Sequence, residues 1–257
     1  MGTQLTITVI SPITHGDFKN IYAGGNILSF RRMPMICGNR RIDVPVISGN
    51  SIRAIMRRYL TREFITALNL NELLSQSAFD RLYRVMAGGG FLEKDMERAI
   101  SPNRISETRK LLPPLSCFGA AMYRYMLSGV VNVGFAVLQC KELETGDMLI
   151  PELIEDVTLT RLPVASGDSP MIYTTECVIP GAQFRIEISF ASTATPLEIS
   201  CIMHGLNTLT ALGGQTSAGF GKVSVAPTNL DDSRYINWLE NTAHGRISEI
   251  IKFAEEL

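Results

Sequence analysis

Apolar and polar residues alternate in two distant parts of the chain, and an alternation with period two predicts strands with one buried face. Residues 5–9 place Leu, Ile and Val on one side, and residues 184–190 do the same with Phe and Ile. A third stretch, residues 130–137, is apolar almost throughout, which predicts a buried central strand. Residues 42–47 form another extended segment, and Pro45 within it favours a sheet edge or a strand start.

Helical periodicity begins after residues 48–51, where Asn50 and Ser51 can cap the exposed N–H groups of a helix. From there apolar residues recur at steps of three and four, which places them on one stripe. The stripe comprises Ile52, Ile55, Met56, Tyr59, Leu60 and Phe64. Arginines that lie off this stripe are expected to face solvent or a ligand. They are Arg53, Arg57 and Arg62.

Residues 69–112 read as an inserted helical subdomain, because helix-like segments at 72–86 and 91–99 are separated by three glycines and by Pro102. Pro113 and Pro114 are expected to end it. The segment 115–119 that follows then leads into the apolar run.

The second half of the chain contains two more predicted helices. Residues 195–212 predict a helix that leads into a glycine-rich loop, and residues 232–257 predict a final amphipathic helix or a pair of turns. Residues 156–181 have no helical period and predict an extended hairpin or a mobile loop. The order strand, helix, strands, then strand, helix, strand is that of a ferredoxin-like, RRM-type sandwich. We therefore predict an α+β fold with an antiparallel sheet, whose core comprises residues 1–68 and 113–257.

The glycine-rich loop, residues 213–222, has four glycines in nine residues, which allows unusual backbone angles and close approach of another backbone. A mononucleotide-binding P-loop requires Gly, four residues, then Gly-Lys-Ser/Thr. Here Thr216 stands at the first of these positions, and Val223 follows Lys222 where a hydroxyl residue should stand. The spacing argues against a nucleotide triphosphatase. On its own the loop fits either a bound phosphate chain or a turn without a ligand.

Composition predicts a folded, soluble and cytoplasmic protein, because hydrophobic residues make up 46% of the chain and no apolar stretch reaches the roughly 20 residues of a membrane span. No secretory signal is visible at residues 1–8. The net charge of −1 hides a segment, residues 31–62, in which eight arginines face one acid, Asp43, a local charge near +7. The C-terminal stretch is mildly acidic, so the two ends could attract neighbouring copies as well as a polyanion.

Metal sites and disulfides are not predicted. The five cysteines are an odd number without a Cys-x-x-Cys pair, which favours buried free thiols. The three histidines are not spaced as metal ligands. No cofactor is indicated.

Four segments in order resemble the RAMP superfamily of CRISPR-associated proteins, and within it the crRNA-coating backbone subunit, the Cas-seven-like family. Residues 46–57 are similar to its I-P-G-S-S-L-K-G-x-x-R turn, and residues 117–119 to its x-F-G. Residues 174–188 resemble E-x-V-P-x-G-x-x-F-x-x-E-I, and residues 213–223 resemble G-G-x-x-S-x-G-x-G-K-V. Each segment is weak alone, but together they extend over nearly the whole chain.

The resemblance implies a subunit that stacks head to tail along a guide RNA (crRNA), grips its sugar-phosphate backbone and inserts a hairpin, the thumb, between bases. The thumb would lie at about 156–181, with Met171 as a wedge, and residues 69–112 would be the variable helical lobe. The implied partners are the crRNA, target DNA or RNA, other copies of the chain and other effector subunits, without a membrane.

The residues predicted to bind RNA come from the capping turn and its helix, the glycine-rich loop, the thumb and the basic segment. They are His15, Arg40, Arg41, Asn50, Ser51, Arg53, Arg57, Arg58, Met171, Gln215, Thr216, Ser217, Phe220 and Lys222. Helix N-termini, backbone amides and arginines suit a sequence-independent grip on phosphates. Aromatic stacking platforms, typical of sequence-specific RRM readers, are scarce in the matched strands.

A binding role without catalysis is the preferred hypothesis. In target-cleaving relatives an aspartate follows a Gly-Gly in the loop after the first strand, whereas here Gly24 and Gly25 precede Asn26, an amide that cannot take up a proton. Asp17 is the alternative carboxylate, at another offset. An endoribonuclease that processes crRNA precursor or cleaves target RNA is the competing hypothesis, for which the early histidine His15 is the available proton carrier. A third hypothesis, an enzyme with a small phosphate substrate, depends on the glycine-rich loop alone.

Overall fold

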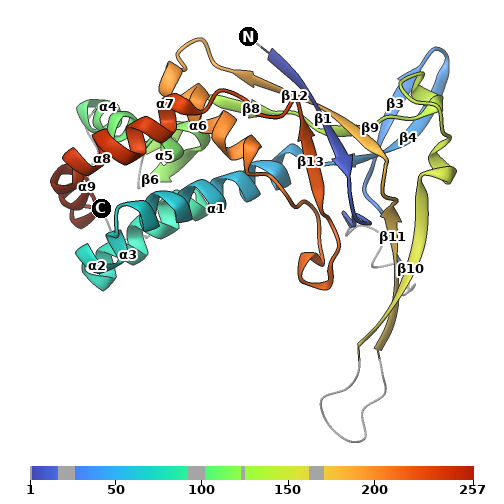
Figure 1. The fold of residues 1–257 in the computed structure, drawn as a ribbon, viewed down its shortest axis with the longest axis horizontal. Helices are drawn as coiled ribbons and strands as arrows, with labels where there is room; N and C mark the ends of the chain where they lie inside the picture. The colour runs from blue at the N-terminus through green and yellow to red at the C-terminus, as the bar shows by residue number, and fades with distance from the viewer. Residues whose placement is uncertain (1, 17–26, 92–101, 123–124, 162–170) are drawn as a thin grey trace, which may run out of the picture.

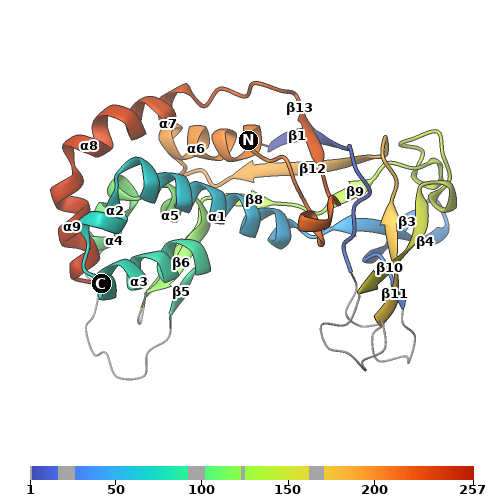
Figure 2. The ribbon, with the colours of Figure 1, turned by 60° about the horizontal axis from the view of Figure 1, so that its bottom comes forward.

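The computed structural model describes residues 2–16, 27–91, 102–122, 125–161 and 171–257. It is an α+β fold with antiparallel sheets, as predicted. Helices gather at one end of the molecule and two hairpins project at the other (Figures 1 and 2).

The main sheet has seven strands in the order β13-β1-β12-β9-β4-β3, with β8 also paired to β12. The strands are β1 (Gly2–Val9), β3 (Arg32–Cys37), β4 (Arg40–Ile47), β8 (Val131–Val133), β9 (Ala136–Leu138), β12 (Gln183–Phe190) and β13 (Val223–Ala226). Every pairing in this sheet is antiparallel. The strands predicted from period two, β1 and β12, lie side by side, with Leu5 opposite Ile186.

The apolar run 130–137 is not one central strand, which corrects the prediction. It divides into β8 and β9, and both pair with β12. Between the register pairs Val133–Ile188 and Val137–Arg185, three residues face two residues of β12, which is the extra residue of a β-bulge. At this bulge Phe135 is 42% exposed, so an apolar pattern did not imply burial there.

Pro45 lies inside β4, which pairs with β3 on one side and with β9 on the other. The N–H of Val46 donates to the Arg31 carbonyl, on the β3 side. Because successive residues point to opposite edges, the nitrogen of Pro45 faces the other side, where pairing with β9 begins only at Val46. The sheet therefore accommodates the proline without a lost ladder bond, although β4 is not an edge strand.

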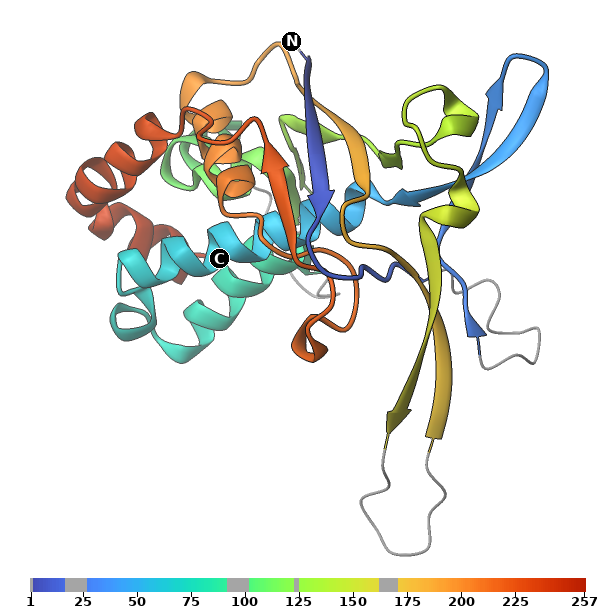
Figure 3. The ribbon, with the colours of Figure 1, turned by 45° about the vertical axis from the view of Figure 1, so that its right-hand side comes forward.

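A long antiparallel hairpin, β10 (Ile154–Arg161) and β11 (Met171–Val178), occupies the region predicted as a hairpin or a loop. A short strand, β2 (Ile27–Leu28), pairs with β11 in parallel. The hairpin extends away from the main sheet (Figure 3).

Helices cover one face of the main sheet and continue beyond it. They are α1 (Gly49–Ala67), α2 (Leu70–Leu73), α3 (Gln76–Tyr83), α4 (Pro102–Leu111), α5 (Pro113–Phe118), α6 (Pro196–Asn207), α7 (Ser233–Asn237), α8 (Ala243–Gly245) and α9 (Ile247–Glu255). Short π segments follow α3 and α7 at Arg84–Gly88 and Trp238–Thr242, and 3-10 turns lie at Lys141–Leu143, Ile150–Glu152 and Thr216–Ala218. A small sheet joins β5 (Gly90–Phe91), β6 (Gly119–Met122) and β7 (Tyr125–Ser128). The core forms where α1 and α6 meet the buried faces of β1 and β12.

Prolines begin three of these helices, α4, α5 and α6. The start of α6 at Pro196 was predicted, whereas the other two prolines were expected to interrupt or end helical structure. Pro102 is the first residue of α4, and Pro113 is the first residue of α5. A proline at the first helical position loses no intrahelical bond, because that N–H has no partner in any helix. The segment 115–119, expected to lead into a strand, is mostly helix α5. The subdomain boundary at residues 69 and 112 stays a prediction.

Candidate nucleic-acid interface

One loop after β1, residues 11–15, joins parts of the chain that are distant in the sequence. The N–H of Ser48, which caps α1, donates to His15 Nε2 (3.2 Å). One residue earlier, the carbonyl of Thr14 accepts from the N–H of Gly214 (2.9 Å). The α1 N-terminus and the glycine-rich loop therefore contact consecutive residues and lie next to each other.

The other end of the glycine-rich loop is held by the same segment. Gly221 N–H donates to the Pro12 carbonyl (2.8 Å), and Lys222 N–H donates to Ser11 Oγ (2.9 Å). Ile13 exchanges two backbone hydrogen bonds of 3.0 Å with Val178 at the root of the β10–β11 hairpin. Three predicted RNA-binding segments, the capping turn, the loop and the hairpin, thus meet at residues 11–15.

The N-terminal turn of α1 offers a positively polarised surface. Ser48 Oγ accepts from the N–H of Ser51 (3.2 Å), so the helix start is capped as predicted, but by Ser48 and not by Asn50 or Ser51, which lie inside the helix. No acidic residue occupies the first turn. Asn50 is exposed. Gly49 is packed so closely that a Cβ there would lie 2.1 Å from the carbonyl oxygen of Val133. The first turn combines the positive end of the helix dipole with small polar side chains, which is a suitable place for a phosphate.

Glycines with positive φ also determine the shape of the neighbouring glycine-rich loop. Gly213 and Gly221 have φ angles of 83° and 77°, and a Cβ at Gly213 would lie 2.2 Å from the Thr14 carbonyl oxygen. Between them Thr216 and Ser217 form an exposed 3-10 turn with two hydroxyl groups. The exposed ammonium of Lys222 follows at the end of the loop.

His15 is a neutral acceptor in this arrangement. Burial, and then the charge of Arg31, lower its pKa below the usual value. Because Nε2 accepts from the Ser48 N–H, the ring proton resides on Nδ1. The ring also packs edge-on against Phe30, with centroids 6.1 Å apart. His15 thus holds the capping turn in place, and a positive charge on it would remove the acceptor.

The hairpin root is fixed by an ion pair that the sequence analysis did not single out. Glu176 Oε2 accepts from Arg32 Nη1 (2.7 Å) and from the Phe30 N–H (2.6 Å), and its Oε1 accepts from Arg32 Nη2 (3.1 Å). Burial alone would raise the pKa of Glu176, but the hydrogen bonds from Arg32 and Phe30 outweigh it and lower that pKa. Glu176 lay in a quoted motif, yet its partner Arg32 is 144 residues away, so spacing could not reveal the pair.

Arg53 and Arg57 are half-buried and donate to carbonyls of the chain itself, which the interpretation of the α1 stripe did not predict. Arg53 Nη2 donates to the Phe118 carbonyl (2.9 Å). Arg57 Nε donates to the Met86 carbonyl (2.6 Å), and its Nη2 donates to the Gly119 carbonyl. Burial, and then Arg53, lower the pKa of Arg57 to about 10, so it remains charged at neutral pH. Both guanidinium groups hold α5 and the π segment against α1.

The remaining arginines do not form one continuous track. Arg40 and Arg41 are exposed at the tip of the β3–β4 hairpin, which points away from the glycine-rich loop (Figure 3). Arg58 and Arg62 are exposed on α1, one turn apart. Tyr59, expected on the buried stripe, is 41% exposed.

Some predicted features lie outside the described residues or depend on side chains that are not described. Asp17 and the Gly24–Asn26 segment lie outside the described residues. Met171 is the first residue of β11, and the position of its side chain is likewise outside the description.

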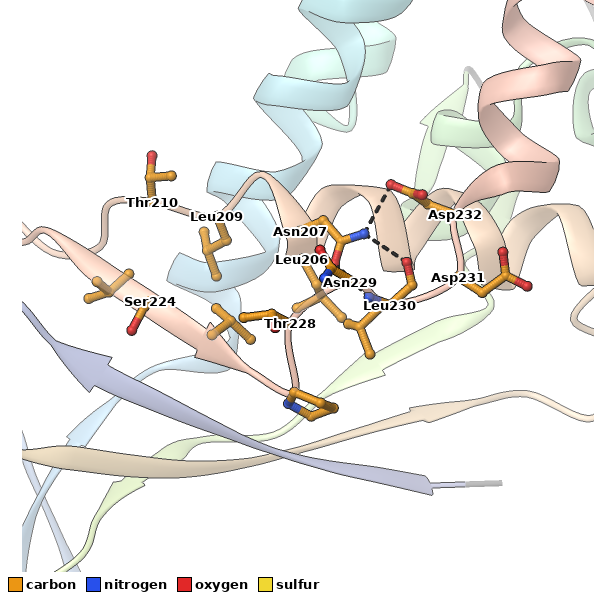
Figure 4. Close-up of a pocket in the computed structure, with 13 residues that line it drawn as sticks. Leu206, Asn207, Leu209, Thr210, Ser224, Thr228, Asn229, Leu230, Asp231 and Asp232 are labelled. Carbon is orange, nitrogen blue, oxygen red and sulfur yellow. Dashed lines mark hydrogen bonds between the residues drawn. The ribbon is translucent and has the colours of Figure 1, made fainter.

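A cavity of about 750 Å³ lies between the end of α6 and the segment after β13 (Figure 4). Asp231 and Asp232 line it, and none of its thirteen lining residues is a lysine or an arginine. Asn207 Nδ2 donates to Asp232 Oδ2 (3.0 Å) and to the Leu230 carbonyl (2.8 Å). Two carboxylates without a lining base disfavour a phosphate chain, so we place the interface at residues 11–15 instead.

Four cysteines, Cys117, Cys140, Cys177 and Cys201, are buried thiols, as predicted, and Cys37 is half-buried. Within the described ranges, no three His, Cys, Asp or Glu side chains come together as metal ligands. Likewise, none of the helices described here combines the length and apolarity that a bilayer crossing needs.

These features define an α+β protein in which a helix N-terminus, a glycine-rich loop and a hairpin root converge. No family model matches the sequence, and no curated protein matches it. Among solved structures, the fold matches a chain of a type IV-B CRISPR complex with a TM-score of 0.61 and 20% identity, covering 94% of this chain and 100% of that chain. Csc2 from Thermofilum pendens matches with a TM-score of 0.45 and 17% identity, covering 97% of this chain and 76% of that chain. The first match confirms the predicted resemblance at the level of the fold.

Proposed function

We propose that this chain is a guide-RNA-binding backbone subunit of a CRISPR effector complex, in which copies line up head to tail along the crRNA. The observation that carries the proposal is the convergence at residues 11–15 of the capped α1 N-terminus and the glycine-rich loop. Together they supply the positive end of a helix, hydroxyl groups and an exposed lysine rather than groups that read base edges. Such donors bind phosphates and leave bases free to pair with a target.

The topology of the core supports the proposal. The order β13-β1-β12-β9, with α1 between β1 and β9 in the chain and α6 between β12 and β13, is the order of a ferredoxin-like βαββαβ core. In that interpretation the β10–β11 hairpin is an extension of the core at the interface, in the position of the thumb. We assign the RNA contacts to His15 and to residues of the capping turn and the glycine-rich loop. They are His15, Asn50, Ser51, Gln215, Thr216, Ser217, Phe220 and Lys222.

Retention of single-stranded RNA at varied salt tests the proposal. We expect two RNAs of unrelated sequence to bind with similar affinity, and the logarithm of affinity to fall linearly with the logarithm of salt concentration. Lys222→Ala should reduce that slope by roughly 0.7, the value for one phosphate contact on a single strand. Lys252→Ala, an exposed lysine on α9 at the helical end, is the matched control and should leave the slope unchanged.

The same mixtures separate binding from catalysis. We expect the RNA to be recovered intact on a denaturing gel. Discrete cleavage products would favour the endoribonuclease hypothesis, for which Asp17 is the residue to replace. Failure to retain either RNA at low salt would reject the binding role.

A further inference from the structure

Among the described residues, Glu176 makes the most concentrated hydrogen-bonded contact between the β10–β11 hairpin and the rest of the chain. Its two oxygens accept three hydrogen bonds, from Nη1 and Nη2 of Arg32 and from the Phe30 N–H. The side chains of Glu176 and Arg32 are 20% and 31% exposed. A planar, charge-assisted fork of this kind fixes direction as well as distance.

These three hydrogen bonds of Glu176 to Arg32 and Phe30, the clamp, connect the hairpin to the interface through neighbouring contacts. Phe30, whose N–H is held by Glu176, packs against the His15 ring, and His15 accepts from Ser48 at the start of α1. The carbonyl of His15 also accepts from the Arg31 N–H (2.7 Å), between the two clamped residues. Glu176 therefore joins the hairpin to the same short segment that supports the α1 N-terminus.

Charge at the hairpin root makes Arg32 necessary. In the register of the hairpin, Glu176 faces Asp156, and Glu155 precedes it on the same strand. Like charges directly across a strand pair are destabilising. Arg32 neutralises one of these acids and ties it to β3, so the ion pair offsets a repulsion between the two strands of the hairpin while it anchors β11 to β3.

We propose that Glu176 is a positioning residue, whose clamp on Arg32 and Phe30 fixes the angle between the β10–β11 hairpin and the α1 N-terminus. This inference rests on the proposed function, because the angle would set the spacing at which successive hairpins meet a bound RNA. Glu176 itself makes no contact with RNA in this proposal. Its loss should change the regularity of binding much more than its strength.

Hydroxyl-radical footprinting of a 5′-labelled single-stranded RNA of mixed sequence, saturated with the full chain, tests the proposal. The wild-type protein should give protections at a regular interval. Glu176→Ala should lose that regularity while its affinity falls by less than about threefold, because only preorganisation is lost. Glu176→Gln keeps an acceptor for the Phe30 N–H and should give an intermediate pattern. Glu155→Gln, an exposed acid at the same root, should footprint like the wild type.

Amide exchange without RNA shows whether the clamp has opened, since the Phe30 amide should exchange faster in Glu176→Ala. If thermal denaturation shows that Glu176→Ala is unfolded, the comparison of Glu176→Gln with Glu155→Gln decides. A regular wild-type footprint that both Glu176 variants retain would overturn the positioning role alone. Affinity and regularity lost together by Glu176→Gln would also overturn it. A wild-type protein that protects no RNA would instead reject the proposed function.

Discussion

The two parts of helix α1 differ in what they leave available. Its N-terminal turn, residues 48–51, has small polar residues and is joined through His15 to the segment that holds the glycine-rich loop. Its body contains the arginines expected to hold RNA, yet Arg53 and Arg57 donate to carbonyls of the chain itself. The difference teaches that a basic residue type alone does not identify an anion site. A half-buried guanidinium can instead donate to backbone carbonyls and hold neighbouring elements together.

Replacing Arg57 by alanine should have the largest effect on this comparison. The change leaves the carbonyls of Met86 and Gly119 without their donor, so we expect the free energy of unfolding to fall by about 2–3 kcal/mol. RNA affinity of the folded fraction should not change. Chemical denaturation measures the first quantity, and retention of RNA below the transition measures the second.

Arg58→Ala is the matched control, because Arg58 is the next residue on α1 and is exposed. Its unfolding free energy should stay within about 0.5 kcal/mol of the wild type. If Arg57→Ala instead weakened RNA retention with no loss of stability, the distinction between the two parts of α1 would be wrong.

The next largest effect is on RNA affinity and concerns the glycine-rich loop beside the N-terminal turn of α1. Gly213 and Gly219 both have positive φ, 83° and 89°, but only Gly213 abuts Thr14. Gly219→Ala should cost about 1 kcal/mol of backbone strain and leave the loop in place. Gly213→Ala adds a clash that separates the loop from residues 11–15, so RNA affinity should fall by about tenfold or more, about 1.4 kcal/mol.

Equal RNA affinities for the two alanine variants, measured by filter retention, would show that the contact between the loop and Thr14 is not needed for binding. Because both replacements introduce the same strain, the difference between them isolates the close approach of the two backbones.

Local signals in the sequence predicted much of the fold. The alternation at 5–9 and 184–190 gave β1 and β12, since side chains of a strand with one buried face must alternate. The helix starts at residues 48–51 and at Thr195 were visible because a cap bonds only two or three residues ahead, although the first cap is Ser48 and not Asn50 or Ser51. The bulge at Gly134 and Phe135 was missed, because the extra residue is defined only by the pairing with β12.

The candidate site was predictable where its geometry is local and not where it depends on distant partners. Glycines that need positive φ, such as Gly213, identify a special loop from composition alone. The direction of Arg57 depends on carbonyls 29 and 62 residues away, and no period in α1 contains that information. The same holds for Glu176, whose meaning depends on Arg32.

The smallest expected effect is on stability and concerns the C-terminal part of α1, where Glu63 also bonds to another residue of the chain. His204 Nε2 contacts Glu63 Oε1 (2.7 Å), and its Nδ1 contacts Asp232 Oδ2 (2.8 Å). The hydrogen bond to Glu63, opposed by burial and supported by Asp232, raises the pKa of His204 above 6.5. The charged imidazolium therefore stabilises the fold fully below pH 6.5, and this contribution is lost as the pH rises through the raised pKa.

His204→Gln tests this by urea denaturation from about pH 6 to about pH 9, where both carboxylates stay ionised. Relative to the wild type, the variant should lose about 1 kcal/mol at the acidic end and progressively less toward the alkaline end. RNA retention should be unaffected at every pH, because His204 contacts Glu63 in the C-terminal part of α1 and not the N-terminal turn. A stability difference that grows with pH would mean that the ring is neutral, and a pH-dependent loss of RNA would place His204 with the N-terminal turn instead.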